Sequence, residues 1–222
     1  MERHVLVVFP HPDDETMAVG GAIALHAKAG APITYACLTR GEMGRNMGKP
    51  FFATRESLPA LREKELREAC AILGIADLRL LGFRDKTVEF EDPDRIEGII
   101  HGLLIELRPS LVITYYPGHC VHPDHEATAR AVVRAIRMLP KKERPVLQCQ
   151  AFSQTHAEIL GERDVVLDAS GVWETVFRAW KAHKSQTAGW MEQMEQDLRG
   201  DPEVRERVIG RLSAAGLYTF SV

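Results

Sequence analysis

Short apolar runs alternate with amphipathic segments along the whole chain, and this alternation limits the folds that the chain can adopt. The run Val5–Phe9 is too short for a helix and rich in valine, so it predicts a buried strand. Further strands are expected at residues 33–39, 78–81, 110–116, 146–152 and 164–167, with an edge strand at 217–222. Helices are expected at residues 17–29, 58–73, 94–107, 124–138, 172–184 and 203–214.

Strands and helices that alternate with short connections predict an α/β fold in which helices cover both faces of a parallel sheet. We therefore expect a Rossmann-like three-layer αβα arrangement with a mostly parallel sheet, and a strand order of 3-2-1-4-5 at its centre. No linker, repeat or low-complexity tract interrupts the series, so residues 1–222 are expected to form one domain with a single core.

The overall composition excludes several classes of protein. A formal net charge of -3 gives no electrostatic basis for a nucleic-acid or anionic-membrane partner. No stretch reaches the roughly 20 apolar residues of a membrane span, and the first ten residues do not resemble a signal peptide, so a cytoplasmic location is expected. The cysteines form no C-x-x-C pair, which argues against a structural thiolate zinc site and a disulfide framework; they are Cys37, Cys70, Cys120 and Cys149.

Two polar stretches with similar composition follow the first and the fourth expected strands. Residues 10–15 read PHPDDE and residues 122–126 read HPDHE, and each stretch places two potential metal ligands three residues apart. Imidazole and carboxylate together suit a divalent metal that keeps an open coordination position. In a sheet of order 3-2-1-4-5 these two strands are neighbours at the point where ligands bind. The sequence therefore predicts a metal-dependent hydrolase.

The spacing within the two stretches indicates most of the ligands but not all. His11 and Asp14 are expected to bind the metal, which leaves Asp13 to face a metal-held water molecule. A third protein ligand comes from His122 or His125, and spacing alone does not decide between them. The alternative is that an aspartate merely caps the following helix, but a cap does not explain His11 or the second carboxylate.

Dinucleotide binding is the other common use of such a sheet. It requires a G-x-G-x-x-G turn after the first strand, whose glycines let the backbone approach a pyrophosphate. This chain has carboxylates at that position, and they would repel a diphosphate. We therefore exclude a nicotinamide or flavin cofactor.

At this point the motifs resemble those of a known family. Residues 11–15 (HPDDE) and 122–125 (HPDH) are similar to the two signatures of the LmbE/PIG-L-type N-acetylglucosaminyl deacetylases. Other similar blocks are LTRGE at 38–42, R-x-x-E-x-x-x-A-x-x-x-L-G at 62–74, LGFRD at 81–85 and HKSQ at 183–186. The stretch GEMGRNMG at 41–48 further resembles the bacillithiol-biosynthesis branch, which deacetylates N-acetylglucosaminyl malate.

The resemblance implies a role for each residue of the two signatures. It implies one zinc ion bound by His11, Asp14 and His125, although ferrous iron fits the same ligands. It also implies that Asp13 is the general base and that His122, when cationic, stabilises the oxyanion.

Two further expectations concern the second signature. Asp124 is expected to orient His122 through a hydrogen bond. Some family members have an oxyanion-contacting tyrosine where this chain has Cys120, a weaker donor, so Tyr115, Tyr116 or His119 are the candidates to replace it.

Substrate contacts are expected from polar residues at the same sheet edge. Glu42 and Asp85 follow the second and third strands, where they can bind sugar hydroxyls. The resemblance gives Arg62 a bidentate contact to a substrate carboxylate or phosphate, whereas spacing alone predicts an exposed position on a charged helix. His183 is assigned either a capping or packing role or a substrate contact.

The expected function is removal of the acetyl group from a small N-acetylglucosamine derivative by a zinc-dependent enzyme. The partner is thus a small amino-sugar substrate, and the resemblance also implies a homo-oligomer. One rival is a two-metal phosphoesterase, which needs ligands for a second ion about 4 Å away, and the chain has few carboxylates for it. Another is a metal-binding protein that kept the fold without turnover.

Overall fold

Seven strands form the central sheet of the computed structural model, which describes residues 1–222, in the order β3-β2-β1-β4-β5-β7-β6. The parallel strands are β1 (Val5–Phe9), β2 (Ile33–Cys37), β3 (Asp77–Leu80), β4 (Leu111–Tyr115) and β5 (Val146–Gln150). Strand β7 (Ala214–Phe220) runs antiparallel to both β5 and β6 (Val165–Asp168). The expected central order of 3-2-1-4-5 is confirmed.

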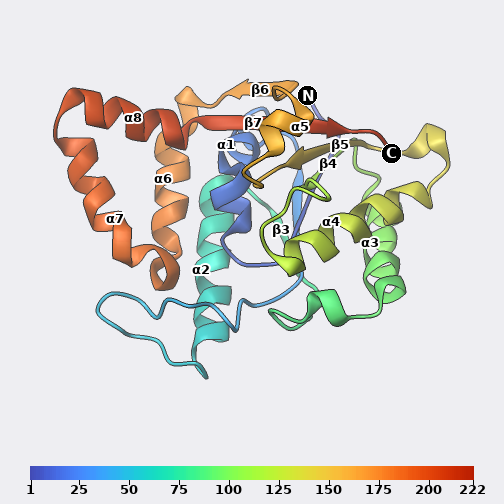
Figure 1. Cartoon of the computed structure of the whole chain (residues 1–222), viewed down its shortest axis with the longest axis horizontal. Coiled ribbons are helices and arrows are strands. Elements are labelled where there is room, and N and C mark those ends of the chain that lie inside the picture. The colour runs from blue at the N-terminus through green and yellow to red at the C-terminus, as the bar shows by residue number, and fades with distance from the viewer.

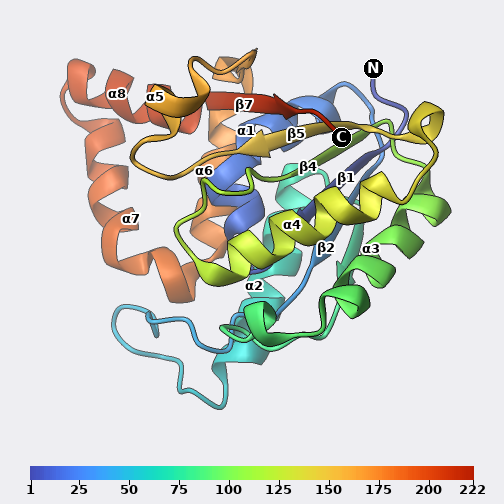
Figure 2. The same cartoon turned by 45° about the vertical axis from the view of Figure 1, so that its right-hand side comes forward.

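Helices cover both faces of this sheet, as the two cartoon views show (Figure 1, Figure 2). One face carries α1 (Asp14–Lys28), α2 (Leu58–Leu73) and α6 (Trp173–Ala182), and the other carries α3 (Pro93–Leu107) and α4 (Pro123–Arg137). Beyond α6 lie α7 (Lys184–Arg199) and α8 (Pro202–Leu212). The short helices are α5 (His156–Leu160), η1 (Val88–Phe90), η2 (Lys141–Glu143) and η3 (Ser170–Val172).

The alternation of side chains along β1 explains why the sheet has a core on each side. Val5, Val7 and Phe9 belong to the core under α1 and α2, while Leu6 and Val8 belong to the core under α3 and α4. All five side chains are fully buried. A shift of one residue in the pairing of β1 would exchange the two sets, so packing on both faces fixes its register and the position of the loop that follows it.

The structure differs from the sequence-based expectation mainly in the last third of the chain. The final strand is not at the sheet edge, because β6 pairs with the side of β7 that faces away from β5. The helix expected over 172–184 ends at Ala182, and the unexpected helix α7 begins two residues later. The helix expected from residue 17 begins earlier, at Asp14.

The loop between β2 and α2, residues 38–57, reaches across the molecule to the beginning of α7 (Figure 2). The backbone N–H of Gly48 donates to the Ser185 carbonyl oxygen at 3.0 Å. The side-chain amides of Asn46 and Gln186 each donate to the other residue's backbone carbonyl, both at 3.0 Å. These contacts hold the loop at the carboxyl end of the sheet.

None of the helices has the length and apolar character that crossing a bilayer requires.

Candidate metal and active site

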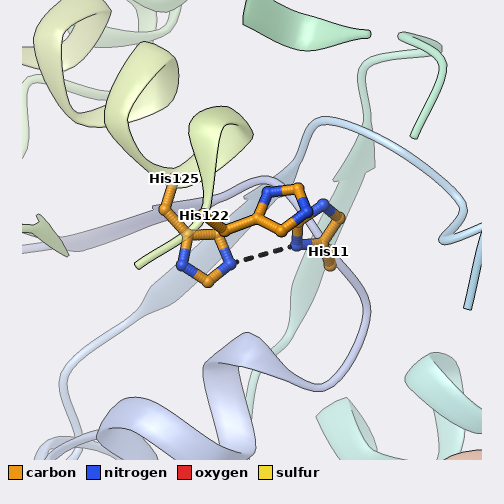
Figure 3. A group of neighbouring side chains, drawn as sticks. All are labelled: His11, His122 and His125. Carbon is orange, nitrogen blue, oxygen red and sulfur yellow. Dashed lines mark hydrogen bonds between the residues drawn. The ribbon is translucent and has the colours of Figure 1, made fainter. Parts of the chain in front are cut away.

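The loops that follow β1 and β4 meet because these strands pair directly with each other. His11 lies in the loop after β1, and His122 and His125 lie at the beginning of α4, which follows β4. Figure 3 shows the three imidazole rings gathered from these two elements, with an interaction drawn between His11 and His125. The pairing of two strands thus joins residues that are more than a hundred positions apart.

Each pair of the three predicted ligands has donor atoms close to each other, with Asp14 facing the two histidines through different oxygens. Nδ1 of His11 lies 3.2 Å from Nε2 of His125 and 3.5 Å from Oδ2 of Asp14. Nε2 of His125 lies 3.5 Å from Oδ1 of Asp14. Two atoms that bind one zinc ion tetrahedrally at about 2.1 Å lie about 3.4 Å apart. The donor types suit a zinc-type ion. The side chains whose donor atoms all lie close together are His11, His122 and His125 in one group, and His11, Asp85 and Asp124 in another. That Asp14 completes the ligand set stays a prediction.

The second nitrogen of His11 faces two carboxylates. Nε2 lies 3.1 Å from Oδ2 of Asp124 and 3.2 Å from Oδ1 of Asp85. Because a carboxylate only accepts hydrogen bonds, Nε2 carries a proton and Nδ1 is the nitrogen left to bind a metal. Asp124 is fully buried and also accepts the backbone N–H groups of Lys86, at 2.7 Å, and Val88, at 3.1 Å.

The hydrogen bond expected from the Asp124 carboxylate to His122 is not formed, so that prediction is wrong. Asp124 lies in the first turn of α4, and its carboxylate oxygens face the loop after β3 and His11 instead. Only its backbone N–H reaches His122, donating to Nδ1 at 3.1 Å. Asp124 is therefore a positioning residue for His11.

Tyr115, the last residue of β4, holds two of the predicted ligands. Its hydroxyl donates to Oδ1 of Asp14 at 2.7 Å, and its ring stacks on His125 with centroids 4.1 Å apart. Oδ2 of Asp14 accepts the His11 backbone N–H at 2.9 Å. Burial opposes ionisation of Asp14, but the neighbouring His125 and the hydrogen bond with His11 hold its pKa well below the usual range. Asp14 is thus kept as the anion that a metal requires.

The residues considered as replacements for the oxyanion tyrosine all have other partners. The Tyr115 hydroxyl is used by Asp14, and His119 shares a hydrogen bond with Ser153. The Cys120 thiol donates to the Tyr116 carbonyl oxygen, and burial raises the pKa of this thiol. The ring of Tyr116 packs against Phe220 of β7. None of these four residues lines the pocket described below.

Asp13 has a backbone conformation that only its surroundings can maintain. Its φ is 102°, in the left-handed region that side-chain-bearing residues rarely adopt. Its backbone N–H donates to Oε2 of Glu15 at 3.0 Å, and its Oδ2 lies 2.9 Å from Nη2 of Arg62. Burial raises the pKa of Asp13 to about 6, against the lowering effect of Arg62. Its side chain makes no capping hydrogen bond, so the N-cap alternative is wrong for Asp13.

Arg62 is neither exposed nor free. Only 3% of the residue is accessible, so the exposed position predicted from spacing is wrong. Its guanidinium donates to the carbonyl oxygens of Gly41, at 2.9 Å, and Pro12, and it pairs with Asp13. Arg62 therefore fixes the loop that carries the predicted base, and its contact to substrate stays a prediction.

A buried ion pair connects the first signature to the C-terminal third of the chain. Glu15 and His183 are both fully buried, and Oε1 of Glu15 lies 2.8 Å from Nε2 of His183. Burial lowers the pKa of His183, but Glu15 more than compensates, so the pKa is raised. His183 therefore has the packing role that the sequence allows, since its side chain makes no capping hydrogen bond and does not line the pocket described below.

A pocket of about 260 Å³ opens over these groups. It is lined by His11, Asp13, Asp14, Met43, Gly44, Arg45, Arg62, Asp85, Lys86, His122, His125 and Gln186. Of the expected substrate residues, Arg62 and Asp85 are in this lining. Glu42 is not, because its carboxylate turns to accept the Asp85 backbone N–H at 3.2 Å.

His122 is held as a neutral hydrogen-bond donor rather than as a cation. Its Nδ1 accepts the Asp124 backbone N–H, so the ring proton is on Nε2. Burial and the nearby His11 lower the pKa of His122 below its ordinary value. The expected cationic form is therefore disfavoured in this arrangement.

Sequence reasoning missed the positioning residues. The expectation for Tyr115 concerns only the oxyanion, yet a tyrosine that ends a buried strand needs a partner for its hydroxyl, and the adjacent ligand loop supplies one. The sequence gives no assignment for Glu15, although a carboxylate inside the apolar pattern of α1 requires a buried counter-charge. No sequence signal pointed to His183 as that partner.

A Rossmann-like sheet with histidines and carboxylates gathered at its carboxyl edge defines an α/β enzyme scaffold with a candidate metal centre. The chain belongs to the PIG-L family, because residues 6–136 match its model, which is described as GlcNAc-PI de-N-acetylase. A probable N-acetyl-alpha-D-glucosaminyl L-malate deacetylase 2 of Bacillus subtilis strain 168 is 50% identical over 204 residues, which cover 92% of each chain. The resemblance inferred from the motifs is confirmed.

Solved structures share the fold at low identity. An N,N'-diacetylchitobiose deacetylase from Pyrococcus horikoshii is similar with a TM-score of 0.74 and 20% identity, over 99% of this chain and 84% of that one. The 4-carboxy-2-hydroxymuconate hydratase GalB from Pseudomonas putida has the same TM-score and identity, over 99% and 97%. Because the same fold is found in a deacetylase and a hydratase, the reaction must be argued from the site.

Proposed function

We propose that the protein is a metal-dependent N-deacetylase that converts N-acetylglucosaminyl malate to glucosaminyl malate and acetate. The observation that carries the proposal is the arrangement of His11, Asp14 and His125 at ligand distances, with Asp13 in the same pocket and outside that set. The close relative named as an N-acetylglucosaminyl malate deacetylase supports the substrate.

The donor set supports zinc as the metal, with ferrous iron compatible with the same ligands. Two imidazole nitrogens and one carboxylate leave a coordination position open for solvent or substrate. When bound, such an ion polarises a carbonyl group and lowers the pKa of a bound water molecule toward about 7.

Asp13 is placed to move the protons of the reaction. Its pKa of about 6 makes it a base near neutral pH that can also return a proton. It accepts a proton from the attacking water and delivers it to the sugar nitrogen as the C–N bond breaks, which releases acetate and the free amine. Arg62 keeps the Asp13 carboxylate directed into the pocket during both transfers.

His122 is the donor available for the developing oxyanion. Its N–H is on Nε2, because Nδ1 is occupied by the backbone of α4. A neutral donor of this kind stabilises a tetrahedral oxyanion by about 3 kcal/mol in other hydrolases. The ring needs no protonation for this role.

The test measures acetate release from N-acetylglucosaminyl malate, N-acetylglucosamine and a chito-oligosaccharide, with and without a chelator. We expect activity on the malate derivative that chelation abolishes and added zinc restores. Asp13→Asn should keep one zinc per chain and lose turnover by at least about 100-fold. The exposed Asp94→Asn, in the first turn of α3, is the matched control and should behave as wild type.

Three results would contradict the proposal. Full activity of Asp13→Asn with verified metal content would remove Asp13 from the base role. Release of phosphate from phosphoesters together with two metal ions per chain would favour the phosphoesterase instead. Normal zinc binding without acetate release from any of the amino sugars would indicate a protein that binds metal without turnover.

A further inference from the structure

Three cationic side chains line the pocket, and two of them have no anionic partner. Arg62 is committed to Asp13 and to backbone carbonyls. Arg45 and Lys86 are exposed at the pocket, and neither takes part in an ion pair. Unpaired cations beside a substrate pocket provide recognition for anionic groups of a ligand.

The acidic groups of the pocket do not neutralise these two cations, because they are used elsewhere. Asp13 pairs with Arg62, and Asp14 accepts from Tyr115 and His11. Asp85 faces His11 through one oxygen and accepts the Met43 backbone N–H at 2.8 Å through the other. Arg45 and Lys86 therefore remain available to a ligand.

The backbone that carries Arg45 is held on both sides. Arg55 donates to the carbonyl oxygens of Glu42, at 2.8 Å, and Gly44, at 2.9 Å. On the other side Asn46 is joined to Gln186 by two hydrogen bonds. The exposed guanidinium of Arg45 thus extends from a fixed position, which lowers the entropy lost when it binds.

Lys86 extends from a similarly fixed backbone. It has a φ of 63°, in the left-handed region, and its N–H donates to Asp124 at 2.7 Å. Asp124 is the carboxylate that also contacts Nε2 of His11. The lysine is therefore positioned by the residue that orients a predicted metal ligand, and Lys86 itself is exposed and lines the pocket.

We propose that Arg45 and Lys86 recognise the carboxylates of the substrate's aglycone and select a dicarboxylate over a neutral one. The inference rests on the proposed function for the position of the sugar. Two cations match the two negative charges of a malyl group. Arg45 offers a planar, bidentate donor and Lys86 a point charge, so Arg45 is expected to contribute more.

The kinetic test uses three N-acetylglucosaminides that differ in the aglycone. The aglycone is malate with two carboxylates, glycerate with one, or glycerol with none. We expect wild-type kcat/KM to fall about tenfold for each carboxylate removed. In Arg45→Gln, the loss on the malyl substrate should exceed the loss on the glycerol substrate by about tenfold. Lys86→Gln should show the same pattern with a smaller difference.

Arg205→Gln is the matched control. Arg205 is exposed on α8, so this substitution removes the same charge at a position away from the pocket. It should leave all three rates at the wild-type value. Equal losses of Arg45→Gln on the malyl and glycerol substrates would overturn the proposal, since they would indicate a general effect on the loop. An unchanged rate on the malyl substrate would overturn it as well.

A binding measurement separates this inference from the proposed activity. Calorimetry with the zinc-loaded protein compares glucosaminyl malate with methyl glucosaminide, and neither compound needs to be deacetylated. Tighter binding of the malate compound, reduced about tenfold in Arg45→Gln, supports the carboxylate site even if no acetate is released. Equal binding of both compounds by the wild type overturns the carboxylate site, while acetate release independently tests the enzyme.

Discussion

Replacing Tyr115 with phenylalanine removes one hydroxyl group from the support of the metal site and little else. That hydroxyl donates to the ionised Asp14 carboxylate at 2.7 Å in a site where Tyr115 is 2% exposed, so water cannot take its place. A hydrogen bond to a charged group is worth about 1.5–3 kcal/mol, or about 10- to 150-fold in an equilibrium constant. Outer contacts to metal ligands typically contribute about 10- to 100-fold. We therefore expect zinc affinity to fall about 10- to 100-fold.

The assay titrates the metal-free protein with zinc against a chromophoric chelator and then measures turnover at saturating zinc. Because the phenylalanine ring keeps the stacking on His125, kcat at saturation should stay within about threefold of wild type. Tyr116→Phe is the control, since its ring packs against Phe220 and its hydroxyl has no partner at the metal site. It should leave zinc affinity unchanged.

The opposite pattern would refute this reasoning. If Tyr115→Phe bound zinc as tightly as wild type but lost kcat by about 100-fold, the hydroxyl would act on the oxyanion. The Asp14 contact would then not be its function. That outcome would restore the tyrosine role that the sequence resemblance left open.

Three further changes test the residues around the site. Gly41→Ala places a Cβ against the Arg62 guanidinium at a φ of +63°, so turnover and the melting temperature should both fall, and the left-handed backbone alone costs about 1–2 kcal/mol. Asp124→Asn should weaken zinc binding about 10- to 100-fold in the same titration. The folded-state pKa of His183 is raised above 6.5 by Glu15, despite burial, so its stabilising contribution is complete below that pH and is lost as pH rises through the raised pKa. Urea unfolding across this range should show the loss in wild type and not in His183→Gln.

The sequence predicts the parallel half of the fold because its signals are local. Val5–Phe9 and Leu111–Tyr115 are short, fully buried runs, and the strand-order rule for such sheets then places their loops together. The position of β7 between β5 and β6 is not a local property. The position of β7 depends on where the last residues of the chain join the sheet after α6, α7 and α8. The sequence of these last residues contains no pattern that specifies the neighbouring strands.

The candidate site likewise contains residues that the local sequence predicts and contacts between distant residues that it does not. The ligands were found because His11, Asp14 and His125 are chemically rare and regularly spaced, although their binding of metal stays a prediction. Their supports were not found, since Asp124 reaches His11 rather than His122 through a contact across 113 positions. Such pairings follow from how α4 sits against the loop after β3, and spacing along one chain does not contain that information. The expected homo-oligomer likewise stays a prediction.

The buried contact between Glu15 and His183 has a consequence for how the molecule can be divided. The segment that matches the family model ends at residue 136, but the counter-ion of Glu15 lies 47 positions further along. A shortened protein that kept only the matched segment would lose His183 together with α6 and α7, so Glu15 would have neither its counter-ion nor the helix that packs against α1. The matched segment therefore shares part of its framework with the rest of the chain.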